Sequence, residues 1–114
     1  MALAGNSTSL QSLHPSLLPY AKWLLSVAPS VGVRSLRITS VKRSRAQQVA
    51  LYRDFLAGRS RYPVARPGTS KHEFGLAFDM VTEPYSALWQ LGALWKKAGG
   101  FWSETDAIHF ESPK

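Results

Sequence analysis

The sequence contains no cysteine, which excludes disulfide bonds and thiolate metal sites. A bound metal ion would therefore need nitrogen and oxygen ligands. No stretch is apolar over the length of a membrane-spanning helix, because Pro19 and Lys22 interrupt the apolar N-terminal segment. This segment also lacks the basic start of a secretory signal peptide. We therefore expect a mature, soluble protein.

Acidic residues are scarce, with seven Asp and Glu against fourteen Lys and Arg, for a net charge of +7. The excess is concentrated in residues 34–71, where Asp54 is the only acid. Such a surface can attract a polyanion, or it can serve solubility alone. The basic residues are spread over several predicted elements without a recognised nucleic-acid-binding motif, so we expect no nucleic-acid partner.

The chain of 114 residues, 45% of them hydrophobic, is long enough for one compact domain. It has no repeat and no linker that would separate a second domain. Hydrophobic periodicity and turn residues predict helices at 16–28, 44–57 and 84–98, strands at 35–40 and 74–81, and two short strands flanking a turn within 101–114. This mixed order favours an α+β fold with a small, mainly antiparallel sheet and about three helices.

Apolar residues at helical or strand spacing identify the faces that we expect in the core. Pro15 suits the first turn of the first helix, and Ser44 can cap the second. Each helix has one apolar stripe, and strand 74–81 has one apolar face. The expected core residues are Leu17, Leu24 and Val27; Val49, Tyr52 and Leu56; Phe74, Leu76, Phe78 and Met80; and Leu88, Leu91 and Trp95.

The other face of strand 74–81 has an unusual composition, because it carries Gly75, Ala77 and Asp79. Two residues with almost no side chain beside an aspartate are poor strand composition, unless something must approach the backbone closely. His72 lies just before the strand, where a loop can turn its imidazole toward Asp79. A histidine and a carboxylate that face an open patch indicate metal ligands.

A third ligand is available near the C-terminus, in the segment DAIHFE. If Ile108 and Phe110 face the core, His109 points to the opposite side of its strand. Two histidines and one carboxylate leave a coordination position open, as in catalytic rather than structural zinc sites. Zinc in such a site lowers the pKa of its bound water to about 7. The sequence therefore predicts a catalytic zinc site formed by His72, Asp79 and His109.

A general base must lie beside that water. Asp106 precedes His109 by three residues, so we expect it in the turn before the strand, where it could reach the water without joining the ligand set. Glu104 is the second choice for this base. Glu111 would lie on the His109 face of the strand, either as a partner of the metal ligands or as a surface residue.

At these positions the sequence resembles the zinc D-Ala-D-Ala carboxypeptidases and the related phage-type L-alanyl-D-glutamate endopeptidases, which share a fold with lysostaphin-type enzymes and the hedgehog signalling domain. The family pattern SxHxxGxAxD is met in full by Ser70, His72, Gly75, Ala77 and Asp79. A second family pattern, an acid three residues before a histidine, is met by Asp106 and His109. A block similar to SGYRS followed by QxxLY is represented by Ser40, Arg43, Ser44, Gln48, Leu51 and Tyr52. Together these blocks cover roughly residues 36–111.

The resemblance implies a role for each of these side chains. Asp106 would act as general base and then as general acid. Arg43 would hold the substrate carbonyl or its oxyanion, and Ser70 would support substrate near the metal. The zinc ligands that the resemblance implies are the same three residues, His72, Asp79 and His109.

The reaction implied by the resemblance is hydrolysis of a peptidoglycan stem peptide by a monomer, and the basic surface would suit anionic cell-wall polymers. We expect one zinc peptidase domain over residues 1–114, with an N-terminal helical segment at 1–34 and the catalytic core at 35–111. Without a signal peptide, such a protein would be made in the cytoplasm and would reach the bacterial wall by phage-lysin-like export or release.

Two departures from the family pattern bear on specificity. Val41 and Lys42 stand where the family has glycine and tyrosine before the arginine, which affects local substrate contacts and the orientation of Arg43. The acid before His109 is aspartate, where many carboxypeptidases of the family have glutamate. Aspartate there, the short chain and the following HFE are more similar to the phage-type endopeptidases. The resemblance therefore favours cleavage between L-Ala and D-Glu, with D-Ala-D-Ala carboxypeptidase activity as the alternative.

Three other classes of protein fit part of the pattern. Non-haem iron oxygenases also use two histidines and one carboxylate, but they usually pair a histidine and the carboxylate two residues apart in an all-β barrel, whereas His72 and Asp79 are seven apart. A domain of this fold could bind cell wall without cleaving it, although neither a ligand nor the acid is missing here. The basic surface could bind nucleic acid, which strongly salt-dependent DNA affinity without peptidase activity would reveal.

Overall fold

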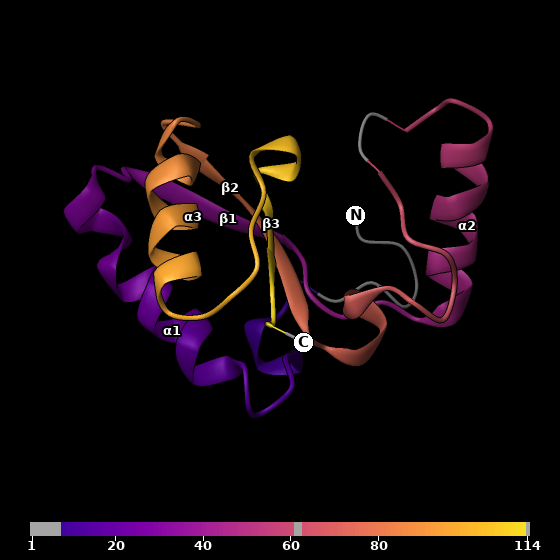
Figure 1. Ribbon diagram of the computed structural model, residues 1–114, viewed down its shortest axis with the longest axis horizontal. Helices are drawn as coiled ribbons and strands as arrows, with labels where there is room; N and C mark the ends of the chain where they lie inside the picture. Colours follow the sequence, from indigo (N-terminus) through magenta and orange to yellow (C-terminus); the bar gives the residue numbers. More distant parts are fainter. Residues whose placement is uncertain (1–7, 61–62, 114) are drawn as a thin grey trace.

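The computed structural model describes residues 8–60 and 63–113, which form three α-helices and one antiparallel sheet (Figure 1). The sheet has the strand order β1–β2–β3, and its strands are Ser35–Ser40, Ala77–Glu83 and His109–Glu111. The helices are α1 (Leu18–Val27), α2 (Arg45–Leu56) and α3 (Ala87–Lys97). The described residues also form four short 3-10 helices, η1 (Leu10–Ser12), η2 (Ala28–Val31), η3 (Lys71–Phe74) and η4 (Glu104–Asp106). The predicted α+β fold is confirmed.

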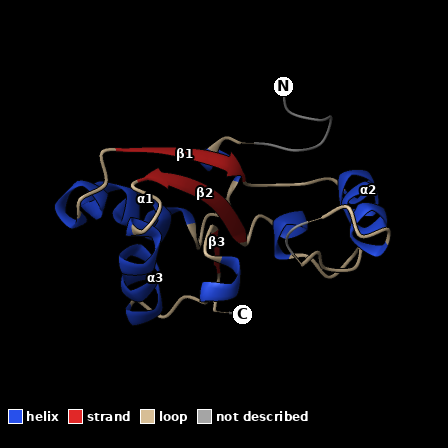
Figure 2. Cartoon of the chain, turned by 90° about the horizontal axis from the view of Figure 1, so that it is seen from above, coloured by secondary structure: helices blue, strands red, loops and turns tan. Residues whose placement is uncertain are grey.

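Helices α1 and α3 cover one face of the sheet (Figure 2). The fully buried side chains between them include Leu24 of α1, Leu88 and Leu91 of α3, and Phe78 and Met80 of β2. Because side chains alternate along a strand, the residue between Phe78 and Met80 points to the opposite face. The hydrophobic core therefore lies on one side of the sheet, and the other side is left for polar residues.

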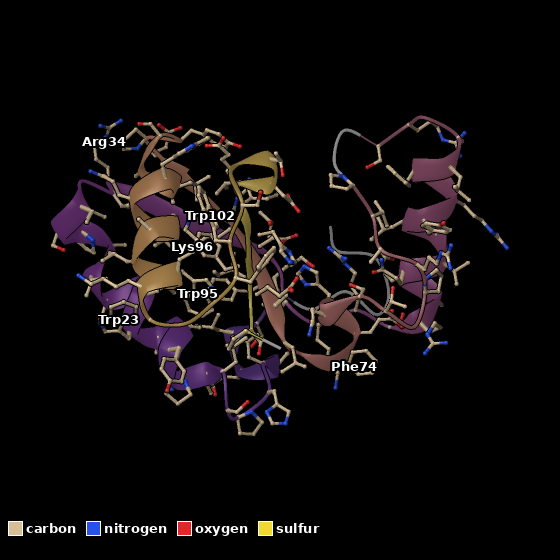
Figure 3. All side chains as sticks on the ribbon, viewed as in Figure 1. Trp23, Arg34, Phe74, Trp95, Lys96 and Trp102 are labelled. Carbon is tan, nitrogen blue, oxygen red and sulfur yellow. The ribbon has the colours of Figure 1, made fainter. Side chains whose placement is uncertain are left out.

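Three aromatic side chains join β2, β3 and α3 within this core. The rings of Phe78 and Phe110 stack with centroids 5.4 Å apart, and Trp95 meets both rings edge-on, at 5.5 and 6.1 Å. Trp95 points from α3 toward the sheet (Figure 3). Aromatic pairs in these arrangements stabilise a core beyond the area that they bury. They hold β2 and β3 together directly behind Asp79 and His109.

Helix α2 lies apart from α1 and α3, on the other side of the molecule (Figure 1). Ser44 caps it as predicted, because its hydroxyl accepts a hydrogen bond from the backbone N–H of Gln47 at 3.1 Å. The expectation that Leu56 faces the core is wrong, since this side chain is 67% exposed. The buried residues of α2 are Gln47 and Gln48. No residue of α2 belongs to the hydrophobic core, and its two buried residues are polar.

The segment before β2 also differs from the expectation that a strand begins at Phe74. Residues Lys71–Phe74 form η3, and β2 begins only at Ala77. Ser70 and Glu73 form a capping box that starts this short helix, and Gly75 ends it with a φ of 70°. Phe74 therefore projects outward and is 52% exposed rather than buried (Figure 3).

The small residue at position 75 is explained by the chain's own N-terminal segment. The backbone N–H of His14 donates to the Gly75 carbonyl at 2.8 Å. A Cβ at Gly75 would lie 3.0 Å from both the His14 nitrogen and the Ser12 carbonyl oxygen. The close approach that the sequence predicted therefore occurs, but the approaching group is backbone rather than a ligand.

Of the two short strands expected within 101–114, only β3 forms among the described residues, and Phe101 makes an isolated bridge to Glu111 instead of a second strand. The remaining elements agree more closely with the predicted ones. Strand β1 has the predicted bounds, and α3 buries the predicted stripe of Leu88, Leu91 and Trp95. Helix α1 begins at Leu18, so Pro19 rather than Pro15 lies in its first turn. No helix among residues 8–60 and 63–113 is long and apolar enough to cross a membrane.

We expect Phe78→Ala to lower the free energy of unfolding by about 3–5 kcal/mol, because it leaves a cavity in the aromatic cluster. Urea denaturation followed by circular dichroism measures this loss. Phe74→Ala removes the same side chain from an exposed position and should change stability by no more than about 0.5 kcal/mol. Equal losses in the two variants would contradict this assignment of the core.

Candidate metal centre

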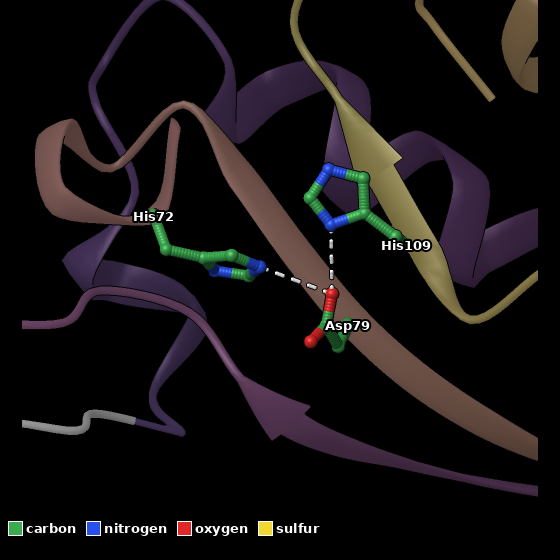
Figure 4. Close-up of side chains that lie close together, drawn as sticks. All are labelled: His72, Asp79 and His109. Atoms are coloured by element: carbon green, nitrogen blue, oxygen red, sulfur yellow. Dashed lines mark hydrogen bonds and ion pairs between the residues drawn. The ribbon is translucent and has the colours of Figure 1, made fainter. Parts of the chain in front are cut away.

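The three predicted metal ligands come from three different elements. His72 lies in η3, Asp79 in β2 and His109 in β3. Asp79 and His109 are direct partners in the antiparallel pairing of β2 with β3, so their side chains leave the same face of the sheet. His72 reaches the same point from η3 (Figure 4). The structure therefore brings together side chains that are up to 37 residues apart.

The donor atoms converge on a single carboxylate oxygen. Oδ1 of Asp79 lies 3.1 Å from Nε2 of His72 and 3.0 Å from Nδ1 of His109. One atom from each residue belongs to a group whose members all lie within 4.8 Å of one another. Bonds of 2.0–2.1 Å to a tetrahedral zinc ion would separate ligand atoms by about 3.3 Å. The distances from Oδ1 of Asp79 to the two histidine nitrogens, 3.1 and 3.0 Å, are close to that value.

In each histidine, the ring nitrogen that points away from Asp79 has its own hydrogen-bond partner. That partner determines which nitrogen carries the proton, and the nitrogen that faces Asp79 is left with a lone pair. Nδ1 of His72 lies 2.7 Å from the Val41 carbonyl oxygen, which can only accept, so the proton of neutral His72 is on Nδ1. Nε2 of His109 lies 2.8 Å from Oε1 of Glu111, which places its proton on Nε2. Both neutral rings then point a lone pair at the Asp79 carboxylate.

Three acceptors that meet in this way need a cation between them. The residues therefore fit a divalent metal ion. In the metal-free protein a proton serves the same purpose. Burial opposes the charge on His109, but its hydrogen bonds to Asp79 and Glu111 prevail and raise its pKa to about 9. Burial is likewise outweighed at Asp79, where the contacts of the carboxylate with His109 and His72 hold its pKa well below the usual range.

Arg43 contacts the other oxygen of the same carboxylate. Its Nη2 lies 3.4 Å from Oδ2 of Asp79, and its Nη1 donates to Oε1 of Gln48 at 3.1 Å. The Arg43 side chain is 14% exposed. Each oxygen of Asp79 thus has its own partners, the histidines for Oδ1 and Arg43 for Oδ2.

A groove of about 630 Å³ opens over this cluster. Its lining includes residues 63–65 and Thr69, from the segment between α2 and η3, and Phe101, Ser103 and Asp106, from the segment around η4. Asp106 lies in η4, in the turn before β3 where the sequence placed it. Burial raises the pKa of the Asp106 carboxyl, and the negative charge of Asp79 adds to this effect. The groove thus contains the Asp106 carboxyl group as well as the three candidate metal ligands.

The remaining candidates have different surroundings. The Ser70 hydroxyl accepts the backbone N–H of His72 at 3.2 Å, so it helps to hold η3, and its contact with substrate stays a prediction. Glu104 is exposed and does not line the groove, which leaves Asp106 as the better placed acid. Glu111 lines the groove and contacts His109, as a partner of a metal ligand would.

Sequence reasoning did not find two groups that orient the cluster. The Val41 carbonyl belongs to the backbone, so its contact with His72 cannot be predicted from the residue type at position 41. Gln48 was noticed in the QxxLY-like block, but its hydrogen bond to Arg43 depends on how α2 is placed.

We expect Zn²⁺ binding to the metal-free protein near neutral pH to release about one proton, because the metal must displace the proton that Asp79 and Glu111 hold on His109. Since the pKa of His109 is about 9, the apparent affinity should rise with pH, about tenfold per unit below that value. Calorimetry in buffers of different ionisation enthalpy counts the released protons. A pH-independent affinity would contradict this description of the cluster.

We expect Glu111→Ala to weaken Zn²⁺ binding by about 10- to 100-fold, because His109 loses the carboxylate that orients its ring. Competition with a chromogenic chelator measures the affinity. Glu104→Ala is a suitable control, since it removes an exposed carboxylate from the neighbouring turn. Equal affinities of the two variants would assign Glu111 to the surface.

Comparison with known proteins gives a family and a shared fold. A family model described as VanY, D-alanyl-D-alanine carboxypeptidase, matches residues 10–110. No curated protein sequence matches the chain. Among solved structures, the chain is similar to the LD-carboxypeptidase LdcB, with 19% identity and a TM-score of 0.68 over 88% of this chain. The chain spans only 58% of LdcB.

Two further structures share the fold. The D,D-pentapeptidase VanY of a VanB-type resistance cassette, solved in complex with Zn(II), is 20% identical with a TM-score of 0.66, over 90% of this chain and 73% of that one. The L-Ala D-Glu endopeptidase ChiX of Serratia marcescens is 22% identical with a TM-score of 0.61, over 92% and 87%. Because the family model covers nearly the whole described chain, the protein belongs to the VanY family of D-alanyl-D-alanine carboxypeptidases.

Proposed function

We propose that the protein is a zinc-dependent peptidoglycan hydrolase that cleaves stem peptides, with L-alanyl-D-glutamate endopeptidase activity as its main reaction. The observation that carries this proposal is the convergence of three atoms that can ligate a metal in one groove, which Asp106 also lines. Membership of the VanY family and the Zn(II) complex of one structural relative support zinc as the metal. Nε2 of His72, Oδ1 of Asp79 and Nδ1 of His109 would hold it.

A zinc ion bound there would act as a Lewis acid on the peptide carbonyl and on the attacking water. The chain itself supplies the proton transfer. Asp106 takes the proton of the water as general base and then gives it to the departing amine as general acid. Its raised pKa favours both steps, because a carboxyl group that titrates nearer to neutral pH can both accept and return a proton.

Arg43 contributes a fixed positive charge at the groove. Burial lowers the pKa of its guanidinium, and the negative charges of Asp79 and Asp106 oppose that effect, so the group remains charged at any physiological pH. A preorganised cation of this kind stabilises the negative charge that develops on the carbonyl oxygen during attack.

Several features support the endopeptidase over the carboxypeptidase. The acid before His109 is aspartate, and the sequence HFE follows it, as in the phage-type endopeptidases that the chain resembles. Among the three structures compared above, the endopeptidase ChiX is the one of which this chain covers the largest share, 87%. The second candidate is a D-Ala-D-Ala carboxypeptidase. It is favoured by the family model and by a VanYB structure in complex with D-alanine-D-alanine, which has a TM-score of 0.71 at 16% identity.

We expect the Zn²⁺-loaded protein to release new D-Glu amino termini from purified peptidoglycan, as read by mass spectrometry. Asp106→Asn should lower the rate by about 10²- to 10⁴-fold, because it removes the general base but keeps the shape of the side chain. Its zinc content, measured in parallel, should match that of the wild type.

Two other outcomes would change the proposal. Free D-Ala without new D-Glu termini would establish the carboxypeptidase. No release from several wall types by the zinc-loaded protein would reject the hydrolase and favour a domain that binds cell wall without cleaving it.

A further inference from the structure

Gln48 is a fully buried polar residue in the first turns of α2, with no exposed side-chain surface. A buried amide is costly unless both its oxygen and its nitrogen are hydrogen-bonded. Gln48 meets this requirement with two partners that belong to different parts of the site. Its role in the proposed reaction therefore follows from what these partners do.

The two ends of the amide have different partners, and their chemistry fixes its orientation. Oε1 accepts a hydrogen bond from Nη1 of Arg43 at 3.1 Å, and Nε2 donates to the Ala65 carbonyl oxygen at 2.8 Å. A guanidinium can only donate and a carbonyl can only accept, so the amide cannot be reversed without losing both bonds. Gln48 thus joins Arg43 to residue 65 in one defined geometry.

The Arg43 guanidinium depends on this contact. Its other described side-chain partner is Oδ2 of Asp79 at 3.4 Å, which is long for a charge-assisted hydrogen bond. The Arg43 backbone is held separately, because its N–H donates to the His72 carbonyl at 3.0 Å. The direction of the guanidinium relative to the groove is therefore set mainly by Gln48.

Ala65 lines the groove in the segment between α2 and η3, which forms the groove wall at residue 65. The described residues between α2 and η3 contain no helix or strand, so side-chain contacts must hold this wall in place. Glu73 holds one end, since its Oε2 accepts the backbone N–H of Gly68 at 2.7 Å. Gln48 holds the middle through the Ala65 carbonyl.

We propose that Gln48 is a positioning residue that sets the guanidinium of Arg43 and the wall at residue 65 as one unit, and so aligns the substrate peptide with the metal centre. This inference rests on the proposed function, because it assigns Arg43 to the substrate carbonyl. The oxygen of Gln48 serves the chemical step through Arg43. Its nitrogen serves substrate binding through the groove wall.

Two substitutions separate these two contributions. Gln48→Glu keeps an acceptor for Arg43 but loses the donor to Ala65, so kcat should stay near the wild-type value while KM rises. Gln48→Met has a similar volume and loses both bonds, so kcat should fall by about 10- to 100-fold, as expected when a group that orients a reacting residue is removed. Steady-state cleavage of a soluble stem peptide measures both parameters.

Gln47→Met is the matched control. Gln47 is the preceding residue of α2 and is 8% exposed, and its side chain has no partner within residues 8–60 and 63–113. A merely structural role of Gln48 would lower thermal stability and leave kcat and KM unchanged in every variant. Unchanged kcat in a folded Gln48→Met protein would overturn the proposal.

A measurement without substrate distinguishes failure of this inference from failure of the proposed function. In ¹H–¹⁵N spectra of the wild type, the Arg43 guanidinium should give a sharp signal, assigned by its absence in Arg43→Lys. Gln48→Met should broaden or remove that signal, and Gln47→Met should leave it in place. An unchanged signal in Gln48→Met would reject the positioning role even if no peptidoglycan is cleaved, and its loss would support the contact whatever the substrate proves to be.

Discussion

The register between β2 and β3 is the constraint on which the rest of the site depends. It pairs Phe78 with Phe110 on the core face and Asp79 with His109 on the opposite face. A shift by one residue would exchange the two faces, burying the carboxylate and exposing the aromatic ring. The stacking of Phe78, Phe110 and Trp95 opposes such a shift. Hydrophobic packing on one side of the sheet thus fixes the chemistry on the other.

The convergence of the candidate metal ligands could be predicted from the sequence because their spacing carries the information. Asp79 and His109 each lie between apolar residues of a strand, so they face away from the core. Asp106 precedes His109 by only three residues, which keeps it near the same end of that strand. The placement of α2 could not be predicted in this way. Its apolar stripe through Leu56 suggested a core helix, yet the helix lies off the core and buries Gln47 and Gln48 instead. Helical periodicity reports which residues share a face, but it does not report what that face packs against.

Phe74 shows a second limit of periodicity. It continues the alternating pattern of β2 backward through Leu76, so a strand beginning at residue 74 fits the apolar residues well. Local hydrogen bonds prevail there, because the capping box of Ser70 and Glu73 favours one turn of 3-10 helix. That turn brings His72 to the metal centre, which an extended chain at this point would not do. The local exception to the pattern is thus the feature that completes the site.

The division of the Asp79 carboxylate between two sets of partners limits how it can bind a metal. With Oδ2 in contact with Arg43 and Oδ1 directed at the histidines, the group presents one oxygen to a metal ion, although a carboxylate can in general chelate an ion through both. Monodentate binding would keep the number of ligands contributed by the protein at three. The rest of the coordination sphere would then stay accessible from the groove, so the arginine that is proposed to hold the substrate would also keep one metal position from being filled by the protein.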